Sequence, residues 1–295
     1  MKFANIEQGS AAGVALISEG SVVPLGALAP WLEGWTVPPA STDELLKSPE
    51  RIGQIRTAWE QAVQSGEEIG LEGSAVRFLP AVLNPGKLVC IGLNYRRHAA
   101  ETNMALPKEP VVFGKFSDSA AAHGDVILHP AETRQLDYEA ELCIVIGRTA
   151  SNVSEEDALD FVFGYCCAND LSARDLQMRS GQWLLGKTGA GFAPLGPFIA
   201  TADEIPDPNR LRISASVNGQ TVQDSNTSDM IFSCRHIIAY LSRHFTLRPG
   251  DVILTGTPEG VVLGKPEAER VWLKPGDEVT VSIEGLGELT NTIGE

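Results

Sequence analysis

Residues 137–147 read Asp137-Tyr138-Glu139-Ala140-Glu141-Leu142-Cys143-Ile144-Val145-Ile146-Gly147. Every second residue from Tyr138 to Ile146 is apolar, which is the period of a strand with one face in the core. Glu139 and Glu141 are therefore expected to point together from the opposite face. Their backbones lie only about 7 Å apart, so the two carboxylates repel each other unless a cation or a shared proton lies between them.

A divalent metal ion would remove this repulsion. Mg²⁺ takes a few carboxylate oxygens and keeps waters that a substrate can displace, so we expect a third acid from elsewhere in the chain. Asp170 is the best candidate, because the apolar strand at 165–169 stops there and a helix can begin. Glu-x-Glu on a strand also fits a solvated face, and on this pattern alone that alternative stays open.

Composition restricts the class of protein. The 295 residues suffice for one large domain and a smaller one, and 43% hydrophobic with 21% charged residues predicts an ordinary soluble globular protein. No apolar run is long enough to span a membrane and no basic leader precedes an apolar block, so we expect a cytoplasmic location. The five cysteines include no Cys-x-x-Cys pair and are interpreted as reduced core residues.

The formal net charge of −15 makes nucleic acid and anionic membranes poor partners. If the ligand is a small acid, local positive charge must overcome this field. A metal ion with neighbouring Arg and Lys side chains would supply that charge.

Residues 1–80 are predicted to be a separate small N-terminal α+β domain. A hairpin is expected over 13–25, a helix start at Ser41 and a second helix over 55–64, with nothing that suggests chemistry. The Pro and Gly residues of segment 80–86 mark the boundary. The catalytic domain is then expected at 85–295.

A buried strand at 87–92 leads into a helix at 94–101 that carries a candidate acid–base pair. His98 and Glu101 are spaced i and i+3, so they share one helical face and can form a hydrogen bond. A carboxylate beside an imidazole fixes its tautomer and raises its basicity, which suits a general base. A solvated His–Glu pair is the alternative, which the spacing alone favours.

Asp170, Arg174 and Gln177 follow at i, i+4 and i+7, one face of one predicted helix. That face would carry a metal ligand, a carboxylate-binding guanidinium and an amide. Residues 181–188 match the phosphate-loop pattern, but the bulky residues and the missing helix after them exclude nucleotide binding. Lys187 is instead interpreted as a lone cation near the acids.

Further elements are predicted downstream. They are a helix from Ser154 to near Gly164, a hairpin around Asn218-Gly219, a helix over 229–245, and a tight loop at 254–260 where backbone amides and Thr257 could hold an anion.

These motifs, in this order, resemble the fumarylacetoacetate hydrolase family. The resemblance runs from about Pro85 to the C-terminus. It implies a mixed β-rich α+β fold, with a β-roll catalytic domain behind a small N-terminal domain, and a homodimer. Its motifs are residues 91–95 with His98 and Glu101, residues 137–141, residues 169–177, Lys187, residues 194–197 and residues 255–258.

The resemblance implies that Glu139, Glu141 and Asp170 bind Mg²⁺ or Mn²⁺. The metal would chelate a 2-oxo or 1,3-dicarbonyl acid and stabilise the enolate that leaves when the central C–C bond breaks. The other implied roles are water activation by His98 oriented by Glu101, oxyanion stabilisation by Lys187, and substrate binding by Tyr95, Arg174, Gln177 and Thr257. Residues 95–106 resemble a mobile lid.

The main expectation is a metal-dependent hydrolase that cleaves the C–C bond of a 2,4-dioxo acid, acylpyruvate-like or a diketo sugar acid. Alternatives are an oxaloacetate decarboxylase or tautomerase, a dioate isomerase, and a non-catalytic member that binds a dicarboxylate. Two segments depart from the family pattern near the expected pocket: Thr188-Gly189-Ala190-Gly191 and Pro258-Glu259-Gly260.

Overall fold

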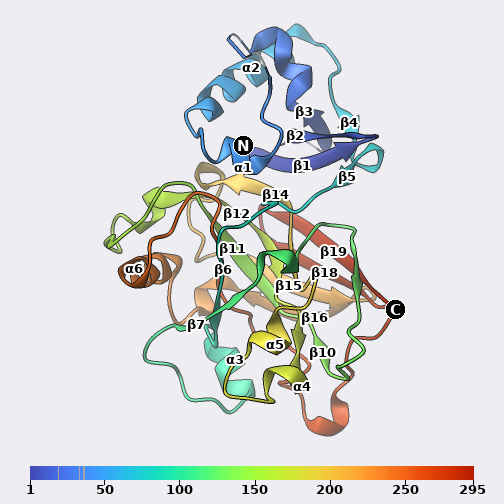
Figure 1. The fold of residues 1–295 in the computed structure, drawn as a ribbon, viewed down its shortest axis with the longest axis vertical. Coiled ribbons are helices and arrows are strands. Elements are labelled where there is room, and N and C mark those ends of the chain that lie inside the picture. The colour runs from blue at the N-terminus through green and yellow to red at the C-terminus, as the bar shows by residue number, and fades with distance from the viewer. Residues whose placement is uncertain (19, 33, 36) are drawn as a thin grey trace.

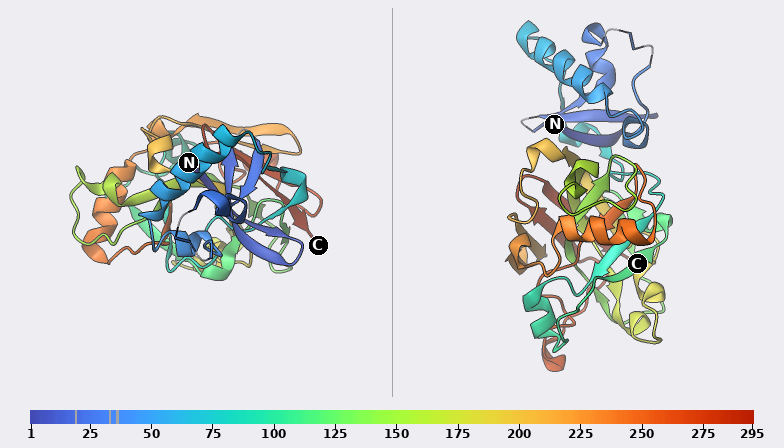
Figure 2. Two further views of the ribbon diagram at one scale, coloured as in Figure 1. Left: turned by 90° about the horizontal axis from the view of Figure 1, so that it is seen from above. Right: turned by 90° about the vertical axis from the view of Figure 1, so that its left-hand side faces the viewer.

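The computed structural model describes residues 1–295 except Glu19, Glu33 and Thr36. Two lobes are stacked along the long axis of the molecule, the smaller one formed by the N-terminal residues (Figures 1 and 2). In the small lobe, the predicted hairpin and helices form, although Glu19 in the hairpin turn lies outside the described residues. Its elements are β1 Lys2–Gln8, β2 Ala11–Ser18, β3 Ser21–Pro24, α1 Thr42–Leu45, α2 Arg51–Ser65, β4 Leu71–Glu72 and β5 Arg77–Phe78.

A large mixed sheet runs through both lobes. Over the described residues its strands follow the open order β4-β3-β2-β1-β14-β12-β11-β17-β6-β7, with only β17 and β6 parallel along this path. The strands outside the small lobe are β6 Leu88–Gly92, β7 Val111–Lys115, β11 Ala140–Ile146, β12 Val162–Asn169, β14 Ala193–Thr201 and β17 Val252–Leu254. The fold is therefore the mixed, sheet-rich α+β type that was expected.

The two lobes share this sheet. β1 pairs with β14, placing Lys2 opposite Ala200 and Phe3 opposite Ile199. Phe3 also belongs to one hydrophobic cluster with Leu88 of the larger lobe. The small lobe is thus continuous with the rest of the molecule, and the predicted domain boundary near residue 85 stays a prediction.

Smaller sheets and short helices complete the larger lobe. A second sheet has the order β16-β15-β18-β19-β9, and β10 pairs with β13. Helices α3, α4 and α5 gather at the end of this lobe that lies away from the small lobe (Figure 1). These elements are α3 Arg96–Glu101, β8 Ala120–Ala121, β9 Val126–Leu128, β10 Leu136–Asp137, β13 Ser172–Ala173, α4 Arg174–Gln177, α5 Leu184–Lys187, β15 Arg212–Val217, β16 Gln220–Asn226, α6 Cys234–His244, β18 Glu278–Ile283 and β19 Gly287–Gly294.

Strand β11 differs from its prediction, because both of its faces are buried. Leu142 and Ile144 pack in one hydrophobic cluster, while Cys143 and Val145 pack in another. A strand in the middle of a sheet that has a core on each side loses its solvent-facing side. Glu141 therefore points into a buried environment.

Three predicted helices have other bounds. The segment expected to be a helix from Ser154 to Gly164 forms only a 3-10 turn, Ala158–Phe161, before β12 begins. The helix expected from residue 170 covers only α4. The helix expected over 229–245 begins at Cys234, where the Ser233 hydroxyl accepts a hydrogen bond from His236 N as an N-cap.

Other expectations are confirmed. The Asn218-Gly219 turn joins β15 and β16. All five cysteines are buried and free. None of the helices in the described part of the chain has the length and apolar character needed to cross a bilayer.

Candidate active site

The pairing of two central strands brings the three predicted metal ligands together. In the register of β11 and β12, Ala140 lies opposite Asn169, so Glu139 and Asp170 follow side by side. Glu139 N donates to Asn169 Oδ1 (3.0 Å), and Asp170 N donates to Glu139 O (2.9 Å). Ligand oxygens of Glu139, Glu141 and Asp170 lie within 4.8 Å of one another, and all three side chains are buried.

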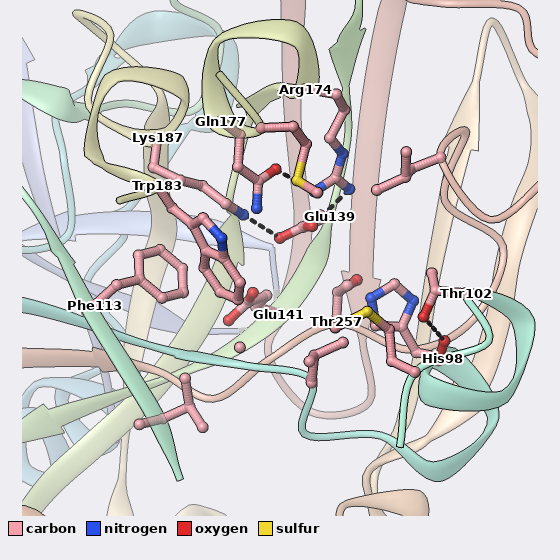
Figure 3. Close-up of a pocket in the computed structure, with 16 residues that line it drawn as sticks. His98, Thr102, Phe113, Glu139, Glu141, Arg174, Gln177, Trp183, Lys187 and Thr257 are labelled. Atoms are coloured by element: carbon pink, nitrogen blue, oxygen red, sulfur yellow. Dashed lines mark hydrogen bonds and ion pairs between the residues drawn. The ribbon is translucent and has the colours of Figure 1, made fainter. Parts of the chain in front are cut away.

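Lys187 and Arg174 are two of the cations that contact these acids (Figure 3). Lys187 Nζ donates to Glu139 Oε2 (2.7 Å) and Asp170 Oδ2 (2.9 Å), and Arg174 Nη2 lies 2.6 Å from Glu139 Oε1. Burial would raise the pKa of Glu139, but the charges of Lys187 and Arg174 outweigh it and lower this pKa to about 2. Burial would lower the pKa of Lys187, but Asp170 and Glu139 raise it. Glu139 and Lys187 are therefore charged at neutral pH.

Glu141 makes no ion pair with any cation of the described residues. Its Oε2 accepts a hydrogen bond from Gly256 N (2.6 Å), so this amide of the predicted anion-binding loop is occupied by the protein's own carboxylate. Burial, with the charges of Asp170 and Glu139, raises the pKa of Glu141 well above its ordinary value. A divalent cation held by the three carboxylates would offset this repulsion, and carboxylate oxygens suit Mg²⁺ and Mn²⁺. The residues present therefore fit the expected metal.

Lys115, at the end of β7, belongs to this cluster although the sequence analysis missed it. Its buried ammonium forms an ion pair with Asp170 and donates to the carbonyl oxygens of Leu171 (3.1 Å), Lys187 and Phe192 (2.8 Å). It thus ties the Asp170 carboxylate to three points of the chain that follows it, at Leu171, Lys187 and Phe192. In the sequence, the position of Lys115 at the end of an apolar strand was the only sign of this role. A lysine at the end of a strand is usually solvated, so the sign is weak.

Asp137, for which the sequence predicts no role, holds Arg174 in the structure. Its carboxylate is fully buried, accepts a hydrogen bond from Arg174 Nε (2.9 Å), and accepts others from the backbone N–H of Tyr138, Val262 and Leu263. Asp137 therefore orients the guanidinium that contacts Glu139 and fixes the loop after Gly260.

Asp170, Arg174 and Gln177 converge on the site, but no single helix carries them. α4 begins at Arg174, and β13 separates it from Asp170. Arg174 Nη1 donates to Gln177 Oε1 (3.0 Å). α5 packs on α4 through Gly186, where a Cβ would lie 2.4 Å from Gln177 N. Only glycine permits this contact, which places the next residue, Lys187, beside the acids.

The predicted acid–base pair is formed at the other side of the site. His98 Nδ1 lies 2.7 Å from Glu101 Oε1, and Glu101 Oε2 accepts a hydrogen bond from Gly260 N (2.9 Å). His98 is buried and lines the cavity. Because Glu101 occupies Nδ1, Nε2 is the nitrogen left for a substrate or water.

Thr257 lines the cavity, whereas Tyr95 is not among the described residues that line it. Thr257 Oγ1 accepts a hydrogen bond from Gln223 Nε2 (3.0 Å), and Gln223 Oε1 accepts one from Ala140 N at the start of β11. Tyr95 is fully buried in the main hydrophobic cluster, and burial raises the pKa of its hydroxyl well above the ordinary value. A direct contact between Tyr95 and substrate remains a prediction without geometric support.

The cavity has a volume of about 80 Å³. Figure 3 shows Glu139 and Glu141 between two walls, with Phe113 and Trp183 on one side and His98 and Thr102 on the other. The predicted residues that line it are His98, Glu139, Glu141, Arg174, Gln177, Lys187 and Thr257.

Comparison with known proteins agrees with this arrangement. The family model described as "Fumarylacetoacetate (FAA) hydrolase C-terminal" matches residues 87–294. A relative named oxaloacetate tautomerase fahd2, mitochondrial, from Xenopus laevis is 44% identical over 284 residues, covering 95% of this chain and 85% of that protein.

Two solved structures are similar over the whole chain. Fumarylacetoacetate hydrolase from Exiguobacterium antarcticum has a TM-score of 0.80 and 34% identity, covering 100% of this chain and 99% of that one. A 2-hydroxyhepta-2,4-diene-1,7-dioate isomerase from Mycobacterium marinum has a TM-score of 0.75 and 30% identity, covering 100% and 98%. The chain therefore belongs to the fumarylacetoacetate hydrolase family.

Proposed function

We propose that this chain is a divalent-metal-dependent enzyme that interconverts the enol and keto forms of oxaloacetate or of a similarly short 2-oxo acid. The observation that carries the proposal is that His98, which Glu101 holds, lines one small cavity together with Glu139 and Glu141, two members of the buried group of three carboxylates. The Xenopus laevis relative, named an oxaloacetate tautomerase, supports the choice among the chemistries of the family. The main expectation from sequence, C–C hydrolysis, thus becomes the second candidate.

The chemistry requires a proton to leave the oxygen on C2 and another to join C3. His98 lines the cavity and can hold or deliver the proton at C3, while Glu101, in contact with Nδ1, fixes the orientation of the ring. Lys187 can stabilise negative charge that develops on the C2 oxygen. Arg174, held by Asp137 and Gln177, can orient a carboxylate. The metal, held by Glu139, Glu141 and Asp170, would supply Lewis-acid stabilisation of the enolate.

The test is the decay of enol-oxaloacetate, followed by its ultraviolet absorbance, with protein stripped by chelator and then given Mg²⁺ or Mn²⁺. We expect ketonisation faster than with the same metal alone, and slow again with His98→Ala. His244→Ala is the control, because His244 lies at the end of α6 and is not among the described residues that line the cavity. It should leave the rate of ketonisation unchanged. Ketonisation no faster than the metal blank would contradict the proposal.

Hydrolysis of a 2,4-dioxo acid is the second candidate. His98 oriented by Glu101 could instead deprotonate water, and the Exiguobacterium antarcticum neighbour is named a hydrolase. Acetylpyruvate offered to the metal-loaded protein distinguishes the two. Loss of its enol absorbance with release of pyruvate would favour hydrolysis. Tight binding of oxalate without turnover of any dioxo acid would favour a dicarboxylate-binding protein.

The proposal also covers the oligomeric state, the metal ion and the cellular location of the protein. A homodimer is proposed from the family resemblance, and light scattering after size exclusion tests it. The choice between Mg²⁺ and Mn²⁺ is left to the assay above. The predicted cytoplasmic location has less support, because the Xenopus laevis relative is named mitochondrial; fractionation of cells tests it.

A further inference from the structure

An aromatic wall closes one side of the cavity. Trp183 precedes α5 and packs edge-on against Phe113 of β7, with ring centroids 5.4 Å apart and an interplanar angle of 71°. The indole lies directly on the backbone of Gly92, where a Cβ would come within 2.5 Å of the ring. Gly92, Phe113 and Trp183 therefore form one packed unit, defined here as the aromatic wall.

The aromatic wall lies next to the ionic cluster, defined here as Glu139, Asp170, Arg174 and Lys187. Lys187 Nζ lies 5.1 Å from the ring centroid of Phe113. In Figure 3 the side chains of Phe113 and Trp183 lie beside Lys187, across the acids from His98. A substrate that contacts the acids and extends away from His98 meets the aromatic wall at once.

This side of the cavity offers no free positive charge. Among the described lining residues, the permanently cationic side chains are Arg174 and Lys187, and both are ion-paired with the acids. Ile91 and Leu93, which flank Gly92, add apolar lining. A carboxylate buried beyond the ionic cluster would lose its hydration without gaining a cationic partner, which is unfavourable.

The geometry points to Trp183 as the residue that limits the length of the acid. This inference rests on the proposed function and narrows its substrate class to short 2-oxo acids whose charged groups all lie at the ionic cluster. A cavity of about 80 Å³ holds on the order of six water molecules. An acid with a longer tail therefore requires the indole to move, and a longer dioate also places its second carboxylate against apolar side chains.

The experiment measures binding as well as turnover. Calorimetric titration of the Mn²⁺-loaded protein with pyruvate, 2-oxohexanoate and 2-oxoadipate compares length and tail charge at a constant 2-oxo acid group. We expect wild type to bind pyruvate more tightly than 2-oxohexanoate, and 2-oxoadipate most weakly. Trp183→Ala should improve the affinity for 2-oxohexanoate relative to pyruvate by roughly tenfold or more, and Trp183→Phe by less.

Leu185→Ala is the matched control, because Leu185 lies on the same helix, is 64% exposed and is absent from the cavity lining among the described residues. It should leave the preference unchanged. Equal affinities of wild type for the three acids, or the same preference in wild type and Trp183→Ala, would overturn the inference. Failure of the proposed function looks different: no ketonisation of oxaloacetate by wild type, whatever the length preference in binding.

Discussion

The two sides of the active site are held in different ways. On one side, Glu139, Asp170 and Lys187 lie in a fully buried network whose members come from distant parts of the chain. On the other side, His98 sits on the short helix α3. Its neighbour Arg97 is 65% exposed and pairs with Glu259, which is 24% exposed. Buried ion pairs fix the first side, whereas on the second side an exposed ion pair accompanies the buried residues His98 and Tyr95.

Glu259 lies on the second side, in the segment Pro258-Glu259-Gly260 that departs from the expected family pattern. Its carboxylate lies 3.0 Å from Arg97 Nη1. Arg97 N donates to Asp229 Oδ2 (3.0 Å), and Gly260 N donates to Glu101. This loop therefore contacts α3, which belongs to the segment expected to be a lid, at two points. This contrast leads us to expect that changes in the buried network alter stability and metal binding, while changes at the lid alter activity.

The largest effect is expected from Lys115→Met. The variant leaves Asp170 buried without one of its cations, which we expect to lower the free energy of unfolding by about 3–5 kcal/mol. Urea denaturation measures this. Lys47→Met, at an exposed position, is the control and should change stability by less than about 0.5 kcal/mol. If Lys115→Met had the same free energy of unfolding as wild type, the buried ion pairs would not be what stabilises this side of the active site.

His98→Ala should affect activity with little change in stability. Loss of the proton-transferring group is expected to lower kcat by roughly 10²–10⁴-fold, since the buried network remains intact. Steady-state kinetics and thermal unfolding are measured on the same samples. If the wild type both hydrolyses a 2,4-dioxo acid and decarboxylates oxaloacetate, the hydrolysis should be lost and the decarboxylation, which needs no general base acting on water, should be retained. Equal loss of both activities would instead assign His98 a role in binding or in closing the lid.

Metal binding should stabilise the folded protein. At a concentration 100 times the Kd, Mg²⁺ or Mn²⁺ adds about 2.7 kcal/mol of stability, seen as a higher Tm by calorimetry. Glu141→Gln removes a ligand and should abolish this shift. The metal-free variant should unfold no more easily than wild type, because Glu141 faces the like charges of Asp170 and Glu139. Glu155→Gln, on the surface, should keep the full shift.

The smallest effect is expected for the Arg97–Glu259 pair. An exposed ion pair contributes about 0–1 kcal/mol, so Arg97→Ala or Glu259→Ala should raise KM by only a few-fold. In wild type, salt should raise KM similarly, because it screens the exposed pair. Arg212→Ala, which breaks another exposed pair with Asp224, is the control. KM values that do not respond to either variant or to salt would show that other contacts hold the lid.

The local sequence pattern was enough to predict which side chains of the site lie on the same face of a strand or helix. Residues 139 and 141 share a strand face at i and i+2, and residues 98 and 101 share a helix face at i and i+3, whatever the rest of the chain does. The structure accordingly brings Glu139, Glu141 and Asp170 together and pairs His98 with Glu101. Asp170, expected as the third acid because the apolar strand stops there, lies beside the other two, although the helix expected after it is a single turn that begins at Arg174.

Only the tertiary structure shows the contacts between residues that lie far apart in the chain. Lys115 and Asp137 are ordinary in sequence, and only the order of strands shows that one contacts Asp170 and the other Arg174. The second face of β11 is buried because a separate hydrophobic cluster packs on that side of the sheet, around Cys143 and Val145. The pairing of Trp183 with Gly92 joins segments far apart in the chain. Sequence determines which residues share a face over a few positions, because backbone geometry is local. It does not determine which charges are buried together, because burial depends on every element that packs around them.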